Sequence, residues 1–293
     1  MSQGGGLVVA LGGGTARAMS HVGVLQAFEA AGVAPSGLAG TSFGALVAAA
    51  FALEPDAERT ASLLLAPRRR QVWAQALDFG LHRASLVHGV KLERWLDRTV
   101  FRGATFGDLS LPLAIATTSL ATGETYLPDS GSLAKAVVAS CALPLLFAPV
   151  RYGEHYVVDG GFLEAVPFRA GLSLEHRLLL GVNTGIDTEQ ARLVRWLQRA
   201  RGRRGMRRFA QFVSSRSLDS AIGRQLRGLG IAGRSYSSAQ LVPEGAHLLR
   251  IDPRIAWWDF HRTHEAVEAG RTAAGRLLDD GFAIEPAAAD GVE

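Results

Sequence analysis

Two glycine-rich segments near the N-terminus carry residue types suited to acyl transfer. The first runs from Gly12 to Arg17 with the sequence GGGTAR, and the second runs from Gly40 to Gly44 with the sequence GTSFG. In a G-x-S-x-G turn, the flanking glycines let the backbone bend sharply from strand to helix and present the serine hydroxyl. Ser42 is therefore the candidate nucleophile. Backbone N–H groups of the first segment, at the start of a helix, are suited to hold an oxyanion.

The residues around both turns predict strand-to-helix junctions. A short apolar segment precedes each turn, at Leu7–Leu11 and at Leu38-Ala39. After Ser42, the almost wholly apolar run from Ala45 to Leu53 predicts a buried helix whose N-terminus points at the serine. The apolar positions that recur at helical spacing after the first turn are Val22, Leu25 and Phe28. Each turn is thus expected to follow a strand and to begin a helix.

Glycine-rich turns also occur in nucleotide-binding sites, whose motifs need further residues. A dinucleotide-binding fingerprint that starts at Gly12 needs glycine at position 17, where this chain has Arg17. A phosphate-binding P-loop needs Gly-Lys-Ser/Thr at the helix start, and no such triplet follows. An ordinary loop remains an alternative for the G-x-S-x-G match, which by itself is only moderately specific.

Ser42 needs a base within hydrogen-bond reach to become a nucleophile. A Ser-Asp-His order could be formed on paper by Asp159 with one of three later histidines, His247, His261 or His264. In an α/β-hydrolase several strands precede the elbow, whereas here about 40 residues do, enough for roughly one βα unit. Asp159 alone is the better candidate, because Tyr156-Val157-Val158 predicts a short strand that ends at Asp159. A plain Asp-Gly turn is the alternative.

Together these residues resemble the patatin-like phospholipases of bacterial type, a family that uses a Ser-Asp dyad. The matching segments are Gly12–Arg17, His21–Leu25, Gly40–Gly44, Thr118–Glu124, Ala139–Pro144 with Phe147–Val150, and Asp159–Gly161. The resemblance covers residues 7 to about 185 well, and residues 249–270 more weakly. Three ordered motifs are more specific than any one of them alone.

The resemblance implies a three-layer α/β/α fold with a central, mostly parallel sheet and a nucleophile elbow. It implies that Ser42 attacks an ester carbonyl and that Asp159 orients or deprotonates Ser42. The N–H groups of Gly13, Gly14 and Thr15 would hold the oxyanion. The expected activity is cleavage of carboxylic ester bonds of phospholipids or other lipids through an acyl-enzyme, with no metal and no cofactor.

Two positions depart from the family pattern. Thr15 stands where the last loop glycine is common, and Ala18 stands where glycine often follows the arginine. A threonine still donates its N–H but does not adopt a positive φ cheaply. These departures motivate an alternative, a non-catalytic lipid-binding or regulatory protein on the same fold; thioesterase and acyltransferase activities also fit the site. Arg17 is expected either to contact an anionic headgroup or to form a structural salt bridge.

Length and composition predict one α/β domain over residues 7–283, with flexible termini at 1–6 and 284–293. The chain has 293 residues, of which 48% are hydrophobic and 20% charged, enough for a large core. Its one cysteine, Cys141, excludes an intramolecular disulfide, and no Cys/His cluster has the spacing of a zinc site.

A basic segment within an insertion at about 190–232 is the main candidate for a partner contact. The arginines expected to face an anionic lipid surface are Arg201, Arg203, Arg204, Arg207 and Arg208. Apolar residues around them recur at three- and four-residue steps, as in interfacial amphipathic helices. A solvated pair of surface helices is the alternative. We expect no nucleic-acid partner, because the formal net charge is only +4 and no nucleic-acid module is present.

The N-terminus lacks the charged and apolar regions of a signal peptide, and no run of about 18 apolar residues could span a bilayer. A cytoplasmic location with peripheral membrane contact is the expectation, with export by a route without a cleaved signal as an alternative. The sequence leaves open the lipid headgroup, the acyl chain, the position of cleavage, the oligomeric state and the need for an activator.

Overall fold

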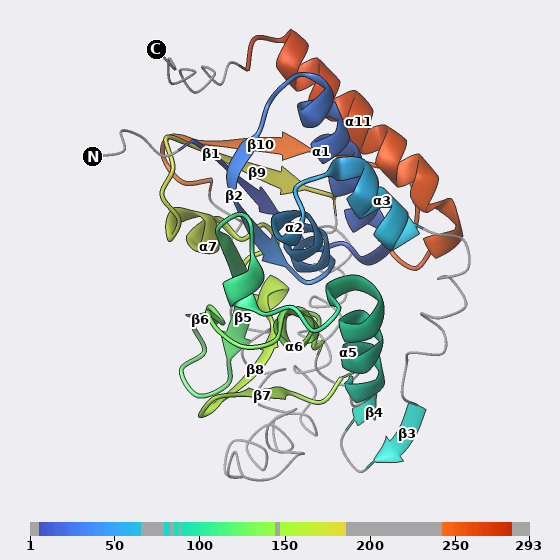
Figure 1. The fold of residues 1–293 in the computed structure, drawn as a ribbon, viewed down its shortest axis with the longest axis vertical. Helices are drawn as coiled ribbons and strands as arrows, with labels where there is room; N and C mark the ends of the chain where they lie inside the picture. The colour runs from blue at the N-terminus through green and yellow to red at the C-terminus, as the bar shows by residue number, and fades with distance from the viewer. Residues whose placement is uncertain are drawn as a thin grey trace, which may run out of the picture.

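A mixed sheet of eight strands forms the centre of the fold (Figure 1). The computed structural model describes residues 6–65, 79–82, 85–87, 89–143, 147–185 and 242–282. The strand order is β10-β9-β1-β2-β5-β8-β7, and β6 pairs with β5. The bounds of these strands are β1 Leu7–Leu11, β2 Pro35–Thr41, β5 Leu113–Ser119, β6 Thr125–Tyr126, β7 Val150–Tyr152, β8 His155–Asp159, β9 Leu178–Asn183 and β10 Ala246–Arg250. A separate two-stranded ribbon consists of β3 Phe79–His82 and β4 Ser85–Val87.

The five strands from β10 to β5 run parallel, whereas β6, β7 and β8 are antiparallel to their neighbours. Parallel strands bring their carboxyl ends to one edge, where α/β folds place their ligand sites. The strand register shows which residues meet at this edge. Thr41 of β2 pairs with Ala116 of β5, and Thr117 of β5 pairs with Asp159 of β8. Ser42 and Asp159 therefore reach the same level of the sheet, on either side of β5.

Helices cover both faces of the sheet. The helices and helical turns are η1 Thr15–Met19, α1 Ser20–Ala30, α2 Phe43–Leu53, α3 Ala57–Leu65, α5 Val90–Leu96, η2 Asp97–Phe101, η3 Phe106–Asp108, α6 Leu133–Ser140, η4 Gly160–Phe162, α7 Phe168–Leu172, η5 Phe260–Arg262 and α11 Thr263–Asp279. The larger core lies on the face covered by α1, α2 and α11, with α11 packed along α1. A smaller core lies on the opposite face, against α7.

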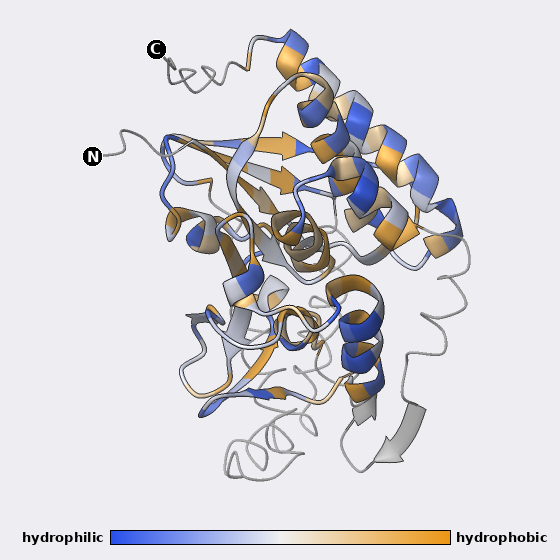
Figure 2. Ribbon diagram, viewed as in Figure 1, coloured by the Kyte–Doolittle hydropathy of each residue, from blue (hydrophilic) through white to orange (hydrophobic). Residues whose placement is uncertain are grey.

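The alternation of side chains in β1 explains the two cores. Leu7, Val9 and Leu11 enter the larger core, while Val8 and Ala10 enter the smaller one. All five are fully buried, as expected for a strand covered on both faces. Figure 2 shows hydrophobic colour along nearly all of α2, which is buried, and a mixture along α11, whose outer face is exposed.

The predicted fold class is confirmed, since the central sheet is mostly parallel and lies between helical layers. The predicted first strand coincides with β1, and the predicted buried helix after Ser42 is α2. The single-domain boundary at 7–283 stays a prediction. The insertion at about 190–232 with its arginines, residues 1–5 of the predicted N-terminal tail and the whole predicted C-terminal tail lie outside the described residues. Within the described part of the chain, no helix combines the length and apolar character needed to cross a bilayer.

Candidate active site

Ser42 occupies the sharp turn between β2 and α2. Its backbone dihedrals are φ 53° and ψ −127°, a conformation that is costly for any residue other than glycine. A residue of α6 stabilises the turn, because the Ser42 N–H donates to the Ser140 hydroxyl at 2.8 Å. The Ser140 hydroxyl in turn donates to the carbonyl of Ala116 at 2.7 Å. Ser140 thereby fastens the strained turn to the neighbouring strand β5.

Gly44 explains how the elbow comes so close to the first glycine-rich loop. A Cβ atom at this position would lie 2.2 Å from the Leu11 carbonyl oxygen and 2.4 Å from that of Gly12. Only glycine permits this approach. The N-terminus of α2, with its partial positive charge, is thus brought against the end of β1.

The Asp159 carboxylate lies next to the Ser42 side chain, close enough for Ser42 to lower its pKa. It is 2% exposed, and its Oδ1 also accepts the Gly161 N–H at 2.7 Å. Burial raises the pKa of Asp159 from 3.8 to about 7, while the bonds from Gly161 and Ser42 act in the opposite direction. A carboxyl group with this pKa changes protonation near neutral pH, as a general base must.

Cys141 lies beside Ser42 and Asp159. Its side chain is 7% exposed and lies next to the Ser42 side chain, which acts to lower the pKa of the thiol. Burial, together with the nearby charge of Asp159, raises the pKa of the thiol, so it stays protonated and is a poor nucleophile. Cys141 therefore belongs to the larger core and also neighbours the candidate nucleophile.

The first glycine-rich loop turns immediately beside Ser42. A Cβ atom added to Gly13 would lie 3.5 Å from the Ser42 Cβ. Gly14 has φ 155°, and a Cβ there would lie 2.3 Å from the Thr184 hydroxyl, so the position requires glycine. Thr15 follows with φ 47°, the left-handed conformation that threonine adopts only at a cost. The departure at Thr15 is therefore accommodated with strain.

The three predicted oxyanion donors are not equivalent in this structure. The Gly13 N–H donates to the Ala165 carbonyl at 3.0 Å, so it is already engaged. Within the described residues, neither the Gly14 N–H nor the Thr15 N–H has an acceptor. The loop is further fixed by the Thr184 hydroxyl, which donates to the Gly13 carbonyl at 2.7 Å.

Arg17 and His21 hold this loop in place. The Arg17 Nε donates to the Ile255 carbonyl at 2.7 Å, and its Nη1 donates to the Gly185 carbonyl at 3.0 Å. These bonds tie the loop to two later segments of the chain. The His21 Nε2 donates to the Gly12 carbonyl at 2.7 Å, and complete burial lowers the pKa of His21 to about 4. His21 is thus neutral at pH 7 and supports the loop.

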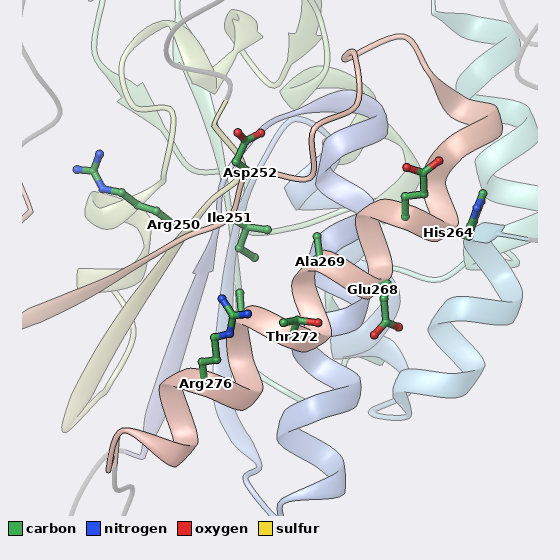
Figure 3. A pocket seen from close by; sticks show the side chains of 10 residues that line it. Arg250, Ile251, Asp252, His264, Glu268, Ala269, Thr272 and Arg276 are labelled. Carbon is green, nitrogen blue, oxygen red and sulfur yellow. The ribbon is translucent and has the colours of Figure 1, made fainter.

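A separate depression lies at the carboxyl end of β10 and along α11 (Figure 3). Its volume is about 540 Å³, and its lining carries charges of both signs, including Asp252, Glu268 and Arg276. Ser42 and Asp159 are not among its lining residues. No group of three His, Cys, Asp or Glu side chains in the described ranges is arranged to hold a metal ion.

The sequence does not single out two residues that support the site. Ser140 belongs only to a segment that resembles the patatin-like family, and Thr184 belongs to none of the matching segments. Each acts across a long sequence separation, 98 residues from Ser140 to Ser42 and 171 from Thr184 to Gly13. A hydroxyl that bonds to a distant backbone leaves no local pattern in a single sequence.

Comparison with known proteins decides the family. The model of the patatin-like phospholipase family matches residues 9–172, which is more than half of the chain and includes both Ser42 and Asp159. The chain belongs to the patatin-like phospholipase family. Among relatives of this patatin-like chain is "Patatin-like phospholipase domain-containing protein 6" of Mus musculus, which is 31% identical over 193 residues, covering 62% of this chain and 14% of the relative.

Two further relatives extend across bacteria and fungi. An uncharacterized NTE family protein of Mycobacterium bovis is 35% identical over 163 residues, covering 55% of this chain and 27% of the relative. "Lysophospholipase NTE1" of Pyricularia oryzae is 31% identical over 175 residues, covering 59% of this chain and 11% of the relative. The patatin-like chain thus corresponds to less than a third of the length of each of these relatives.

A solved structure agrees with the fold. The patatin-like chain superposes on VipD from Legionella pneumophila with a TM-score of 0.50 at 18% sequence identity, covering 95% of this chain and 67% of the other. At this identity the similarity concerns the fold alone.

Proposed function

We propose that this patatin-like protein is a serine hydrolase that cleaves carboxylic ester bonds of lipids. The observation that carries the proposal is the buried Asp159 carboxylate next to the Ser42 side chain, which lies on a strained elbow and lowers the pKa of that carboxylate. A serine beside a carboxylate that titrates near neutral pH has the partner that nucleophilic attack needs. The names of relatives, phospholipase and lysophospholipase, favour lipid esters as substrates.

In the proposed reaction, the Ser42 Oγ attacks the ester carbonyl carbon while Asp159 accepts the hydroxyl proton. The carbonyl oxygen becomes an oxyanion, and the N–H groups of Gly14 and Thr15 stabilise it. Such donors contribute roughly 3 kcal/mol each in well-studied hydrolases. The intermediate collapses, the bond to the leaving oxygen breaks, and the alcohol departs with the proton from Asp159. Water, deprotonated by Asp159, then attacks the acyl-serine. The bond from the acyl carbon to the Ser42 oxygen breaks, the proton passes from Asp159 to that oxygen, and the carboxylic acid leaves.

Gly13 contributes to this reaction in a different way from its two neighbours. Its N–H is bonded to Ala165, so Gly13 serves as an oxyanion donor only if that bond breaks on substrate binding. Its role in the proposal is instead to form the part of the loop that lies beside Ser42, where a Cβ atom at Gly13 would be 3.5 Å from the Ser42 Cβ.

The test is hydrolysis of a soluble short-chain nitrophenyl ester and of phospholipid in mixed micelles. Wild type, Ser42→Ala and Asp159→Asn are compared, with Ser173→Ala as the control because Ser173 bonds only within its own helix end. We expect wild type and the control to hydrolyse the soluble ester, and both site variants to lose activity by at least about a thousandfold. Full activity in Ser42→Ala would refute the proposal.

The alternative is a lipid-binding or regulatory protein without activity. Two features favour it. The Gly13 N–H is already bonded to Ala165, and Thr15 is strained, so fewer well-placed N–H donors face a substrate oxyanion. The same experiment separates the two functions: a wild-type protein that binds phospholipid but hydrolyses neither substrate would support the alternative. Thioesterase or acyltransferase activity would show as turnover of an acyl thioester or as transfer of the acyl group to an added alcohol.

A further inference from the structure

Two adjacent tryptophans lie exposed in the segment between β10 and α11. Trp257 is 38% exposed and Trp258 is 60% exposed, and their rings meet edge to face with centroids 5.2 Å apart. Within the part of the chain that the structure describes, neither indole N–H has a hydrogen-bond partner. Large aromatic side chains are normally buried, so a solvent-exposed pair marks a surface that contacts something else.

The tryptophan pair is fixed to the loop that contains Gly14 and Thr15. The carbonyl of Trp257 accepts the N–H of Ala16 at 3.0 Å, and the carbonyl of Ile255 accepts the Arg17 side chain at 2.7 Å. Ile255 itself is buried at 2% exposure and anchors the segment in the core. The two exposed rings therefore keep a set position relative to the candidate oxyanion site.

A second contact links the same segment to the elbow. The ring of Phe260 lies 5.8 Å, centroid to centroid, from the ring of Phe43, the residue that follows Ser42. The segment also follows the carboxyl end of β10, at the edge of the sheet where β1 and β2 end beside the candidate site. The tryptophan segment thus lies at the same edge of the sheet as Ser42 and packs against the elbow.

The charges near the pair largely balance. The guanidinium of Arg262 pairs with Glu265 at 2.6 Å and with Asp259 at 3.8 Å. What remains distinctive is two large rings, each with an apolar body and a free N–H donor. This chemistry matches the boundary between headgroups and acyl chains of a lipid layer, where tryptophan is enriched.

We propose that Trp257 and Trp258 form a lipid-surface anchor that holds the Ser42 site against a lipid–water interface, whatever the charge of the headgroups. The proposal rests on the proposed function in one respect, that the substrate is presented by a lipid surface. It differs from the interpretation of the arginine-rich segment, which predicts binding that depends on anionic lipid and falls with salt.

Binding is tested in the Ser42→Ala background, so that no lipid is hydrolysed during the measurement. Partitioning onto phosphatidylcholine vesicles is measured by sedimentation, with and without Trp257→Ala/Trp258→Ala. Leu172→Ala is the control, because Leu172 is 48% exposed at the end of α7, which leads into the amino end of β9. We expect the partition coefficient to fall about tenfold or more in the tryptophan variant, at low and at high salt, and to be unchanged in the control. Equal partitioning of the tryptophan variant and its parent would overturn the anchor.

A direct contact measurement guards against misfolding of the double variant. Brominated phosphatidylcholine should quench fluorescence of the Ser42→Ala protein, and Trp257→Phe/Trp258→Phe should remove most of that quenching. Quenching that is unchanged in the Trp257→Phe/Trp258→Phe protein would count against the proposal.

Turnover by the otherwise wild-type chain separates this proposal from the proposed function. Trp257→Ala/Trp258→Ala should keep its rate on the soluble ester and lose rate on vesicle phospholipid. An equal loss on both substrates would contradict an anchoring role. If wild type hydrolyses neither substrate, the proposed function fails, while the vesicle and quenching results still decide the anchor.

Discussion

Replacing Asp159 by asparagine should stabilise the protein at the same time as it abolishes activity. Asparagine keeps the size of the side chain and an oxygen that accepts the Gly161 N–H, but it removes a charge that is 2% exposed. Burial raises the pKa of Asp159 from 3.8 to about 7. The unfolded chain therefore ionises at lower pH than the folded chain does.

The sign and size of the effect follow from this difference. Between about pH 4 and pH 7 the folded state holds a proton that the unfolded state has lost, so wild-type stability falls as pH rises through this window. The difference between the two pKa values lowers the free energy of unfolding of wild type by about 4 kcal/mol at pH 8, and by about 2 kcal/mol at pH 5. Asp159→Asn lacks this penalty. Its free energy of unfolding should exceed that of wild type by these amounts.

Urea unfolding followed by circular dichroism at both pH values measures the difference. Ser42→Ala is the matched control, because it also removes activity but leaves the buried carboxylate in place and removes the neighbouring hydroxyl that lowers its pKa. This control should gain no stability at pH 8. An Asp159→Asn protein that is no more stable than wild type at pH 8, or whose advantage is the same at both pH values, would refute the reasoning.

Further predictions concern the rate, the support of the elbow, the loop and the basic segment. The value of kcat/KM on a soluble ester should rise about tenfold per pH unit below pH 7 and level off above it, as Asp159 ionises; a pH-independent rate would exclude this carboxyl as the base. Ser140→Ala should lower the free energy of unfolding by about 2–3 kcal/mol in urea and kcat by at least tenfold, because the buried Ser42 N–H loses its acceptor. Thr15→Gly should raise the thermal unfolding midpoint, with a gain of about 1 kcal/mol, because it relieves the left-handed φ of 47°. Neutralising the basic segment should weaken binding to anionic vesicles and spare turnover of a soluble ester, and unchanged vesicle binding would remove that interpretation. The arginines to replace together are Arg203, Arg204, Arg207 and Arg208.

Local patterns were enough to predict the parts of the site that lie on single elements. Three local patterns each predict the end of a strand: the apolar run before Gly12, the glycines on either side of Ser42, and the short strand before Asp159. In the structure, the ends of β1, β2 and β8 all lie at the candidate site. The register that brings Ser42 level with Asp159 was not readable, because β8 runs antiparallel to β5 and pairing depends on contacts between distant segments.

The hydrogen-bond partners of individual N–H groups could not be predicted from the sequence either. Gly13 could be recognised as a loop glycine, but its bond to the Ala165 carbonyl joins residues from two ends of the matched region. Likewise, Arg17 could be expected beside the loop, while its two carbonyl partners, Ile255 and Gly185, lie 238 and 168 residues away. Such bonds are set by tertiary packing and carry no signature in residue spacing.

Covalent labelling tests the central claim, that Ser42 is the nucleophile and Asp159 its base, most directly. Wild type, Ser42→Ala and Asp159→Asn are each incubated with a fluorophosphonate, and intact mass and peptide mapping then locate the adduct. The account predicts a single adduct on Ser42 in wild type, none in Ser42→Ala, and labelling at least a hundredfold slower in Asp159→Asn. An adduct on another residue, or ester hydrolysis by a wild-type protein whose Ser42 is never labelled, would contradict it.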